Sequence, residues 1–207
     1  MGVQVYFDVE TTGLNTRFSQ IVSIGAVCGA QQTRIYIYPT CPIPESASNI
    51  HGITQVMPPN ILALNGQTIQ AFTPEQGLQE FLRFLLLVSG GMGQVVLVAH
   101  NCARFDSVVL VENFRRVGLS GRGIIAGFLD TLELARKAVM PPHHPHRNFK
   151  LTTLMRTFLG QEQGHKHDAL QDAVDLRSLV ERMALFNGQT DVGIFFSQFC
   201  QIIPYVD

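Results

Sequence analysis

The feature that most constrains the fold of this chain is an alternating segment at residues 3–10. Apolar and polar side chains alternate there with a period of two, which predicts a β-strand. Successive side chains of a strand point to opposite faces, so we expect Asp8 and Glu10 on one face. Two adjacent carboxylates repel each other, and a cation between them removes the repulsion. Their hard oxygen atoms suit Mg²⁺ or Mn²⁺, and a solvated acidic edge is the alternative for the pair alone.

Bulk composition describes one globular domain. The chain has 207 residues, of which 46% are hydrophobic and 15% charged. No apolar run approaches the roughly 20 residues of a membrane span, and the N-terminus lacks the basic and apolar regions of a signal peptide. The four cysteines are widely spaced, without the C-x-x-C pattern of a structural zinc site. We therefore expect an intracellular protein, cytoplasmic or nuclear, with no membrane partner.

The charge of the chain is unevenly distributed. Residues 100–170 hold ten of the fifteen Lys and Arg residues but six of the sixteen Asp and Glu residues, a net charge of +4. The remainder of the chain carries −5. A basic face beside an acidic metal site suits a nucleic-acid backbone, although charge alone is equally well explained by chance.

Periodicity along the chain predicts strands followed by alternating helices and strands. The expected strands are residues 3–10, 20–29, 32–38, 95–99 and 124–131, and the expected helices start at 73–76 and cover 104–117, 132–139, 151–159 and 169–185. A loop containing residues 49–54 is expected between the third strand and the first helix. This order predicts an α/β fold, a mixed sheet with helices on both faces. We expect one domain over residues 1–185, with the apolar tail 186–207 packed on it.

A second carboxylate follows the buried strand at residues 95–99. Asp106 lies in the first turn of the next helix, and residues three, four and eleven positions further on are all apolar. A carboxylate on such an inward stripe is costly unless it is paired or bound to a cation. The alternative is that Asp106 stabilises the helix dipole. Asn101, between the strand and this helix, could hold the strand end or a substrate group.

A third acidic group opens the last long helix. Asp168 and Gln171 have the spacing of a capping box, with Asp168 as N-cap, which leaves His167 on the preceding loop. Asp172 belongs to the apolar stripe of the helix and is expected to face inward, whereas Asp175 falls on a polar face. A loop histidine suits a general base because the pKa of an imidazole lies near neutrality. Together, four inward carboxylates and one histidine indicate a two-metal phosphodiesterase site.

Three motifs, in this order and with suitable spacing, resemble those of a known enzyme family. They are D-x-E-T-T-G-L from Asp8 to Leu14, A-H-N-x-x-x-F-D from Ala99 to Asp106, and H-x-x-x-x-D from His167 to Asp172. Over about residues 3–185 the chain is similar to the DEDDh, or DnaQ-like, 3′→5′ exonucleases. The three-prime repair exonucleases and the exonuclease module associated with the promyelocytic leukaemia protein are the branches it most resembles. The segment from His51 to Thr54 also looks like the H-G-I-T segment of that family.

The resemblance implies an RNase H-like fold with a five-stranded mixed β-sheet flanked by helices, and two divalent metal ions, Mg²⁺ or Mn²⁺. It implies that Asp8 bridges the two ions, that Glu10 and Asp172 hold one of them, and that Asp106 helps to hold the other. His167 would take a proton from the attacking water.

The same resemblance implies which residues bind the substrate, a nucleic acid with a free 3′ end. They are Thr11, Thr12, Gly13, Leu14, His51, Asn101 and Phe105. Leu14 would wedge against the terminal base. DNA, single-stranded or frayed, is the preferred substrate, RNA is the alternative, and a homodimer is left open.

Other interpretations compete with this one. A non-catalytic nucleic-acid-binding module or a recruitment domain of the same fold would have a different function, but all five motif residues needed for catalysis are present. His165 could replace His167, although only His167 precedes Asp172 by the required spacing. Histidines at 143, 144 and 146 could bind zinc, but the surrounding prolines and the absence of a nearby cysteine favour a solvated loop.

Overall fold

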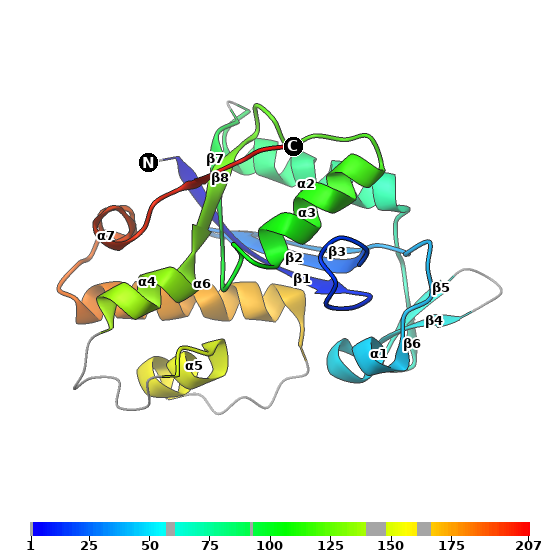
Figure 1. Ribbon diagram of the computed structural model, residues 1–207, viewed down its shortest axis with the longest axis horizontal. Helices are drawn as coiled ribbons and strands as arrows, with labels where there is room; N and C mark the ends of the chain where they lie inside the picture. The colour runs from blue at the N-terminus through cyan, green and yellow to red at the C-terminus, as the bar shows by residue number, and fades with distance from the viewer. Residues whose placement is uncertain (1, 57–60, 92, 140–147, 161–166) are drawn as a thin grey trace.

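The computed structural model describes residues 2–56, 61–91, 93–139, 148–160 and 167–207. Its main element is a mixed sheet of six strands in the order β3-β2-β1-β7-β8-β9 (Figure 1). The strands are β1 (Val3–Thr11), β2 (Ile21–Cys28), β3 (Gln31–Tyr36), β7 (Val95–Ala99), β8 (Ile125–Asp130) and β9 (Ile203–Pro204). Strand β1 pairs antiparallel with β2 and parallel with β7, and β7 pairs parallel with β8.

Helices cover both faces of this sheet. On one face lie α2 (Pro74–Val88) and α3 (Asp106–Arg116), and on the other lie α4 (Thr131–Ala138), α5 (Leu151–Leu159), α6 (Ala169–Phe186) and α7 (Val192–Phe199). Each face encloses its own apolar core, and β1 contributes to both. Phe7 belongs to the core under α2 and α3, whereas its neighbour Tyr6 belongs to the core under α6. The predicted α/β fold with helices on both faces is confirmed, and the predicted elements end within two residues of the observed ones.

The strand count and the loop before α2 were predicted wrongly. A sixth strand, β9, pairs antiparallel with β8 near Gly127, where a side chain would collide with the Ile203 carbonyl. The supposed loop contains helix α1 (Glu45–His51) and a separate antiparallel sheet of β4 (Ile53–Val56), β5 (Ile61–Leu64) and β6 (Gln67–Ile69). Ile53 and Leu62 of this small sheet pack on Val22 of β2. Neither element changes the mixed topology of the main sheet.

Residues 186–207 lie against the rest of the chain. Phe195 and Phe196 of α7 are fully buried in the core beneath α4 and α6, and Tyr205 stacks on Phe128 of β8. This burial explains the apolar composition of the segment.

One close contact fixes the start of α6 over the sheet. Gly25 of β2 is the register partner of Asp8 in β1. A Cβ atom at Gly25 would lie 2.1 Å from the backbone of Ala169 and Leu170, the first residues of α6. The missing side chain therefore lets α6 begin directly above the acidic end of β1. Among the described residues, no helix is both long and apolar enough to cross a membrane.

Candidate active site

The two acidic residues of β1 lie on the side of the sheet that α6 covers. Side chains alternate along the strand, so Asp8 and Glu10 share a face with Tyr6, opposite Phe7 and Val9. Asp8 is partly exposed and Glu10 is buried. A β-bulge follows Glu10, where the register with β2 shifts. The pair therefore lies at the end of β1 that is paired with β2, beyond the residues Val3–Tyr6 that pair with β7.

Asp106 brings a third carboxylate to this end of the sheet. It is the first residue of α3 and is buried, and Phe105 occupies the N-cap position without a side-chain cap. The predicted helix therefore starts at Asp106 itself. Nearby backbone N–H groups, its own and that of Val9, stabilise the ionised form of this carboxylate and partly oppose the effect of burial on its pKa.

The fourth carboxylate and the histidine come from the start of α6. Asp168 is the N-cap, as predicted, and accepts hydrogen bonds from the backbone N–H groups of Leu170 and Gln171. It also forms an ion pair with Arg34 of β3, whose Nη2 atom lies 2.7 Å from both carboxylate oxygens. Asp172 follows one turn later. The Nδ1 atom of the exposed His167 lies 4.0 Å from Asp172 Oδ2.

One prediction about α6 is wrong. Asp175 was assigned to a polar, solvated face, but it is buried and accepts a hydrogen bond of 2.8 Å from the side chain of Gln171. Gln171 is therefore used inside the helix and not as the second half of a capping box. Asp172 is less buried than Asp175, yet Asp172 is the residue placed beside Glu10.

Glu10, His167 and Asp172 form a compact set of potential metal ligands. One donor atom from each lies within 4.8 Å of the others. The Oε1 atom of Glu10 is buried and has no hydrogen-bond partner among the described residues. A buried carboxylate oxygen without a donor is costly, and a cation is the partner that these oxygen ligands suit. The residues present therefore fit a divalent metal ion.

Burial raises the pKa values of all four carboxylates, and the charges of neighbouring acidic groups raise them further. Burial raises the pKa of Asp8 well above its ordinary value, and the charges of Asp106 and Glu10 raise it further. Burial, followed by the charge of Asp172, raises the pKa of Glu10 to about 8. Burial raises the pKa of Asp106 to about 7 and that of Asp172 to about 6, where nearby His167 partly opposes the shift. Such a cluster binds either protons or cations.

A groove of about 750 Å³ opens above these acidic groups. Four of the five predicted catalytic and metal-binding residues line the groove, namely Asp8, Glu10, Asp106 and His167, whereas Asp172 does not. Of the predicted substrate residues, those that line it are Thr11, Gly13, Leu14, His51, Asn101 and Phe105. Leu14 is 84% exposed at the rim, which is unusual for a large apolar side chain and leaves it free to contact a ligand.

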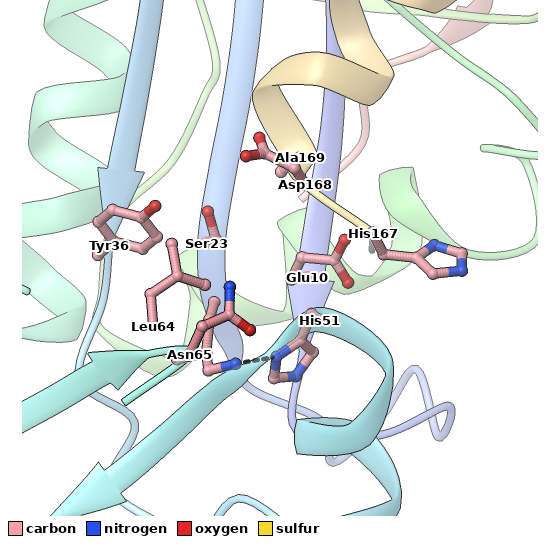
Figure 2. Close-up of a pocket in the computed structure, with 10 residues that line it drawn as sticks. Glu10, Ser23, Tyr36, His51, Leu64, Asn65, His167, Asp168 and Ala169 are labelled. Carbon is pink, nitrogen blue, oxygen red and sulfur yellow. Dashed lines mark hydrogen bonds between the residues drawn. The ribbon is translucent and has the colours of Figure 1, made fainter. Parts of the chain in front are cut away.

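His51 closes one side of the groove from the end of α1. Its Nδ1 accepts a hydrogen bond of 3.0 Å from the Ile53 backbone, and its Nε2 is buried without a partner in the described part of the chain. Burial lowers the pKa of His51. Figure 2 shows the ring beside Glu10, in a small recess that Tyr36 and Asp168 also line. A neutral His51 that accepts a hydrogen bond at Nδ1 therefore carries its proton on Nε2.

The turn after β1 uses its two threonines differently. The Thr11 hydroxyl donates to the Gly13 carbonyl at 2.6 Å and so shapes the turn that faces the groove. Thr12 is buried, does not line the groove, and accepts a hydrogen bond from the Gln20 backbone through its hydroxyl. The Thr12 hydroxyl therefore forms an internal contact, and its predicted substrate contact stays a prediction.

Several residues of the groove were not predicted. Arg104 and His100 line it. Asp130 accepts a hydrogen bond from the backbone N–H of Asn101 in the groove wall. The ring of His100 bonds the Thr131 hydroxyl and the Phe149 carbonyl, both at 3.0 Å, and burial lowers its pKa. An Asp-Thr pair before a helix is an N-cap signal, which could have identified Asp130. The histidines at 143, 144, 146 and 165 lie outside the described residues.

Comparison with known families identifies the kind of domain that carries this site. The model of the RNase_T family, described as Exonuclease, matches residues 5–177. The chain belongs to this exonuclease family. Its DnaQ-like character, predicted from the three motifs, is thereby confirmed, whereas the finer placement among the branches stays a prediction.

Curated relatives of this exonuclease domain include bacterial replication proteins. The chain is 31% identical to "DNA polymerase III PolC-type" of Caldanaerobacter subterraneus over 177 residues, which cover 83% of the chain and 11% of that protein. It is 32% identical to the protein of the same name from Halalkalibacterium halodurans over 193 residues, 91% of the chain and 12% of that protein. The chain thus spans about a tenth of the length of these relatives.

Solved structures of the same fold include Escherichia coli exonuclease I. A complex with a dA16 oligonucleotide has a TM-score of 0.72 and 15% sequence identity, and covers 96% of this chain and 43% of the other. A zinc-bound form in complex with single-stranded DNA has the same TM-score and 16% identity, with the same coverage. At this identity the likeness establishes the fold.

Proposed function

We propose that this exonuclease domain is a metal-dependent 3′→5′ exonuclease that releases nucleoside monophosphates from single-stranded or frayed DNA. The observation that carries the proposal is the buried acidic cluster at the base of the groove, with Glu10 Oε1 lacking any partner among the described residues. Phosphodiester hydrolysis needs positive charge at this position, because the reacting phosphate and the carboxylates are all anionic. RNA is the alternative substrate.

The four carboxylates are the groups that would hold the metal. Glu10 and Asp172 form the compact ligand set together with His167. The charges of Asp106, Glu10 and Asp172 all raise the pKa of Asp8, so Asp8 interacts with the other three carboxylates. We assign Glu10 and Asp172 to one ion, Asp106 to a second, and Asp8 to both. Two Mg²⁺ or Mn²⁺ ions, when bound, stabilise the charge that develops on the attacking and leaving oxygens.

His167 is assigned as the general base. It precedes the N-cap of α6, so it can move without distorting the helix, and 60% of its side chain is exposed. The Nδ1 atom lies 4.0 Å from the Asp172 carboxylate, and we assign Nε2 to accept a proton from water. A catalytic base must reach the reacting water, and a side chain on the groove wall satisfies that requirement.

The shape of the groove favours a chain end over a continuous strand. Leu14 stands at one rim and α1, with Ile50 and His51, at the other. Support for DNA comes from the relatives named as DNA polymerase III proteins and from the oligonucleotide complexes of exonuclease I. A non-catalytic binding module is disfavoured because every carboxylate of the cluster is present. A homodimer and an intracellular location remain predictions.

A parallel digestion tests this function. Single-stranded DNA, duplex DNA and RNA, each 5′-labelled, are incubated with Mg²⁺, with Mn²⁺ and with EDTA. We expect a descending ladder from single-stranded DNA in either metal, none in EDTA, and resistance of a circular or 3′-blocked strand. Asp191→Asn, a change in an exposed residue at the start of α7, is the control for Asp8→Asn. Rapid cutting of the circle would identify an endonuclease and reject the proposal.

A further inference from the structure

A second, basic recess lies beyond the turn that follows β1. It is lined by Arg17, Phe18, Glu112, Arg115 and Arg116. The turn itself connects this recess to the groove, because Leu14 and Thr16 line the groove while the next two residues line the recess. A nucleic-acid strand that leaves the groove past Leu14 would therefore reach the recess next.

The tip of the turn presents an arginine and an aromatic ring to solvent. Phe18 is 68% exposed, and the guanidinium carbon of Arg17 lies 5.9 Å from the centroid of its ring. Arg17 forms no ion pair with any residue that the structure describes. An exposed ring beside an uncompensated cation is the combination that binds the bases and phosphates of single-stranded nucleic acid.

The end of α3 holds this turn in place. Arg116 donates hydrogen bonds to the backbone carbonyls of Arg17 and Ser19, and Asn113 donates to Ser19 and accepts from Ile21. Figure 1 shows the turn alongside α3. The carbonyl partners of Arg116 carry no formal charge, so its positive charge is retained. The surface is therefore preorganised and does not have to be ordered by a ligand.

The net charge of the recess is positive. Arg115 is paired with Glu112 at 2.7 Å, but Arg17 and Arg116 have no carboxylate partner among the described residues. Basic residues in the last turn also favour the helix dipole, which accounts for Arg115 and Arg116. That explanation does not extend to Arg17 and the exposed Phe18, because neither belongs to the helix.

The length of helix α3 gives the distance between the recess and the acidic cluster. It begins at Asp106 and ends at Arg116, and a helix rises about 1.5 Å per residue, so its ends are roughly 15 Å apart. A stacked strand advances about 3.4 Å per nucleotide. The recess is therefore about four to five nucleotides from the site of cleavage.

We propose that the Arg17–Phe18 turn binds the unpaired strand about four to five nucleotides on the 5′ side of its 3′ end. Phe18 stacks on a base, and Arg17 contacts a phosphate. Stacking requires a base whose face is free, which assigns the surface to single strands and not to a duplex. This inference rests on the proposed function, since it takes the 3′ end to lie in the groove.

Binding measured without cleavage tests the inference. Fluorescence anisotropy with 5′-labelled oligothymidylates of 3 and 12 nucleotides is recorded in Ca²⁺, with gels to verify that the strands stay intact. The variant is Arg17→Ala/Phe18→Ala, and the matched control is Arg83→Ala/Leu87→Ala on α2, where an arginine also neighbours an exposed apolar residue. Thermal melting verifies the fold of each variant.

We expect the wild type to bind the 12-mer at least about tenfold more tightly than the 3-mer, as one stacked base provides this much. The double variant should lose at least about fivefold on the 12-mer and almost nothing on the 3-mer. Arg17→Ala alone should lower the slope of log K against log salt by about 0.7. Equal binding of the two lengths by the wild type, or equal behaviour of variant and control, would overturn the inference.

Two combinations of results distinguish a failure of this inference from a failure of the proposed function. If no metal supports cleavage but the length dependence and its loss in the variant are observed, the exonuclease proposal fails and the strand-binding surface stands. If cleavage occurs without length dependence, the surface is rejected and the exonuclease stands. A variant that weakens a blunt duplex as much as the 12-mer would contradict the assignment to single strands.

Discussion

The Oδ1 atom of Asp130 accepts a hydrogen bond of 2.8 Å from the backbone N–H of Asn101. The same carboxylate accepts from Ala103 through Oδ2 at 3.1 Å and caps α4 by accepting from Leu132 at 2.9 Å. Asn101 has a left-handed backbone, with φ of 60°, which a residue other than glycine rarely adopts. One buried side chain at the end of β8 thus shapes the segment that leads to Phe105 and the groove.

Replacing Asp130 by alanine should damage both stability and activity. The change removes an N-cap and leaves two further N–H groups without their acceptor, a cost of about 2–4 kcal/mol. Misplacement of the groove segment should lower kcat/KM by about 10- to 100-fold. Thermal melting and steady-state cleavage of single-stranded DNA measure the two effects.

The matched control is Asp191→Ala, which removes the N-cap of α7 far along the chain from the groove. It should cost about 1 kcal/mol and leave kcat/KM unchanged. Equal loss of activity in both variants would show that Asp130 acts through stability alone.

Asp8→Asn should abolish activity and spare the fold. The change removes a carboxylate from the centre of the cluster, so activity should fall by more than about 100-fold, since changes outside the ligand shell already cost 10–100-fold. In EDTA the melting temperature should be equal to or above that of the wild type, because repulsion with Asp106 and Glu10 is relieved. Cleavage at the wild-type rate would refute the metal assignment.

Stability without metal should fall as pH rises. A carboxylate whose pKa is raised in the folded state contributes stability that is complete below its unfolded pKa of about 4. That contribution is lost as pH passes the folded values, about 6 for Asp172, about 7 for Asp106 and about 8 for Glu10. Melting in EDTA should therefore occur at a lower temperature at pH 8.5 than at pH 5.5, by roughly 2–4 °C for each 1 kcal/mol of stability lost.

Added Mg²⁺ should reverse this loss, with a larger gain in melting temperature at pH 8.5 than at pH 5.5, because protons compete with the metal at low pH. A double variant, Asp8→Asn/Glu10→Gln, should show a smaller pH dependence. The idea of a crowded acidic cluster is contradicted if the wild type in EDTA becomes more stable between pH 6 and 8.

His167→Ala should lower the cleavage rate by about 10²–10⁴-fold, the usual contribution of a general base. Binding of single-stranded DNA should persist, because the variant keeps all four carboxylates. His165→Ala, two positions earlier in the chain, should have a far smaller effect. If His165→Ala lowers the cleavage rate more than His167→Ala does, the general base has been assigned to the wrong histidine.

Gly25→Ala should displace α6. Its Cβ atom would lie 2.1 Å from the backbone at Ala169, which cannot move without shifting the helix that carries Asp172. Overpacking of this kind costs about 1–3 kcal/mol. The melting temperature in EDTA and the gain on adding Mg²⁺ should both decrease, and an unchanged Mg²⁺ effect would mean that α6 tolerates the extra methyl group.

The sequence predicted the main sheet well because its strands have strong signals. Residues 95–99 are an uninterrupted apolar run, as expected of a strand buried on both faces, and β1 alternates strictly. The small sheet was missed although its signal is present: Asn65 and Gly66 both have positive φ in the two-residue turn between β5 and β6. An Asn-Gly pair between apolar runs is a hairpin signal. Prolines at 39, 42 and 44 favour a loop, so this segment was predicted as one.

A site residue was predictable where the sequence of a single strand or helix determines its position. It was less predictable where contacts between elements determine its burial and its partners. Asp8 and Glu10 follow from the period of one strand. Asp175 was misjudged because its burial depends on how α6 meets the sheet, and helical periodicity alone places it among polar neighbours. The hydrogen bond between Thr12 and Gln20 was not predictable, because it is formed across the turn. Contacts between segments are absent from local patterns.

The mixed pairing of β1 has a consequence for how the protein acquires its function. Its parallel partner β7 and the helix that carries Asp172 both follow long stretches of chain, so these contacts close large loops and form slowly compared with hairpins. A folding intermediate that contains only the β1–β2–β3 meander would have Asp8 and Glu10 but neither Asp106 nor Asp172. The full set of carboxylates, and with it the proposed cation affinity, would then be assembled only with the last long-range contacts.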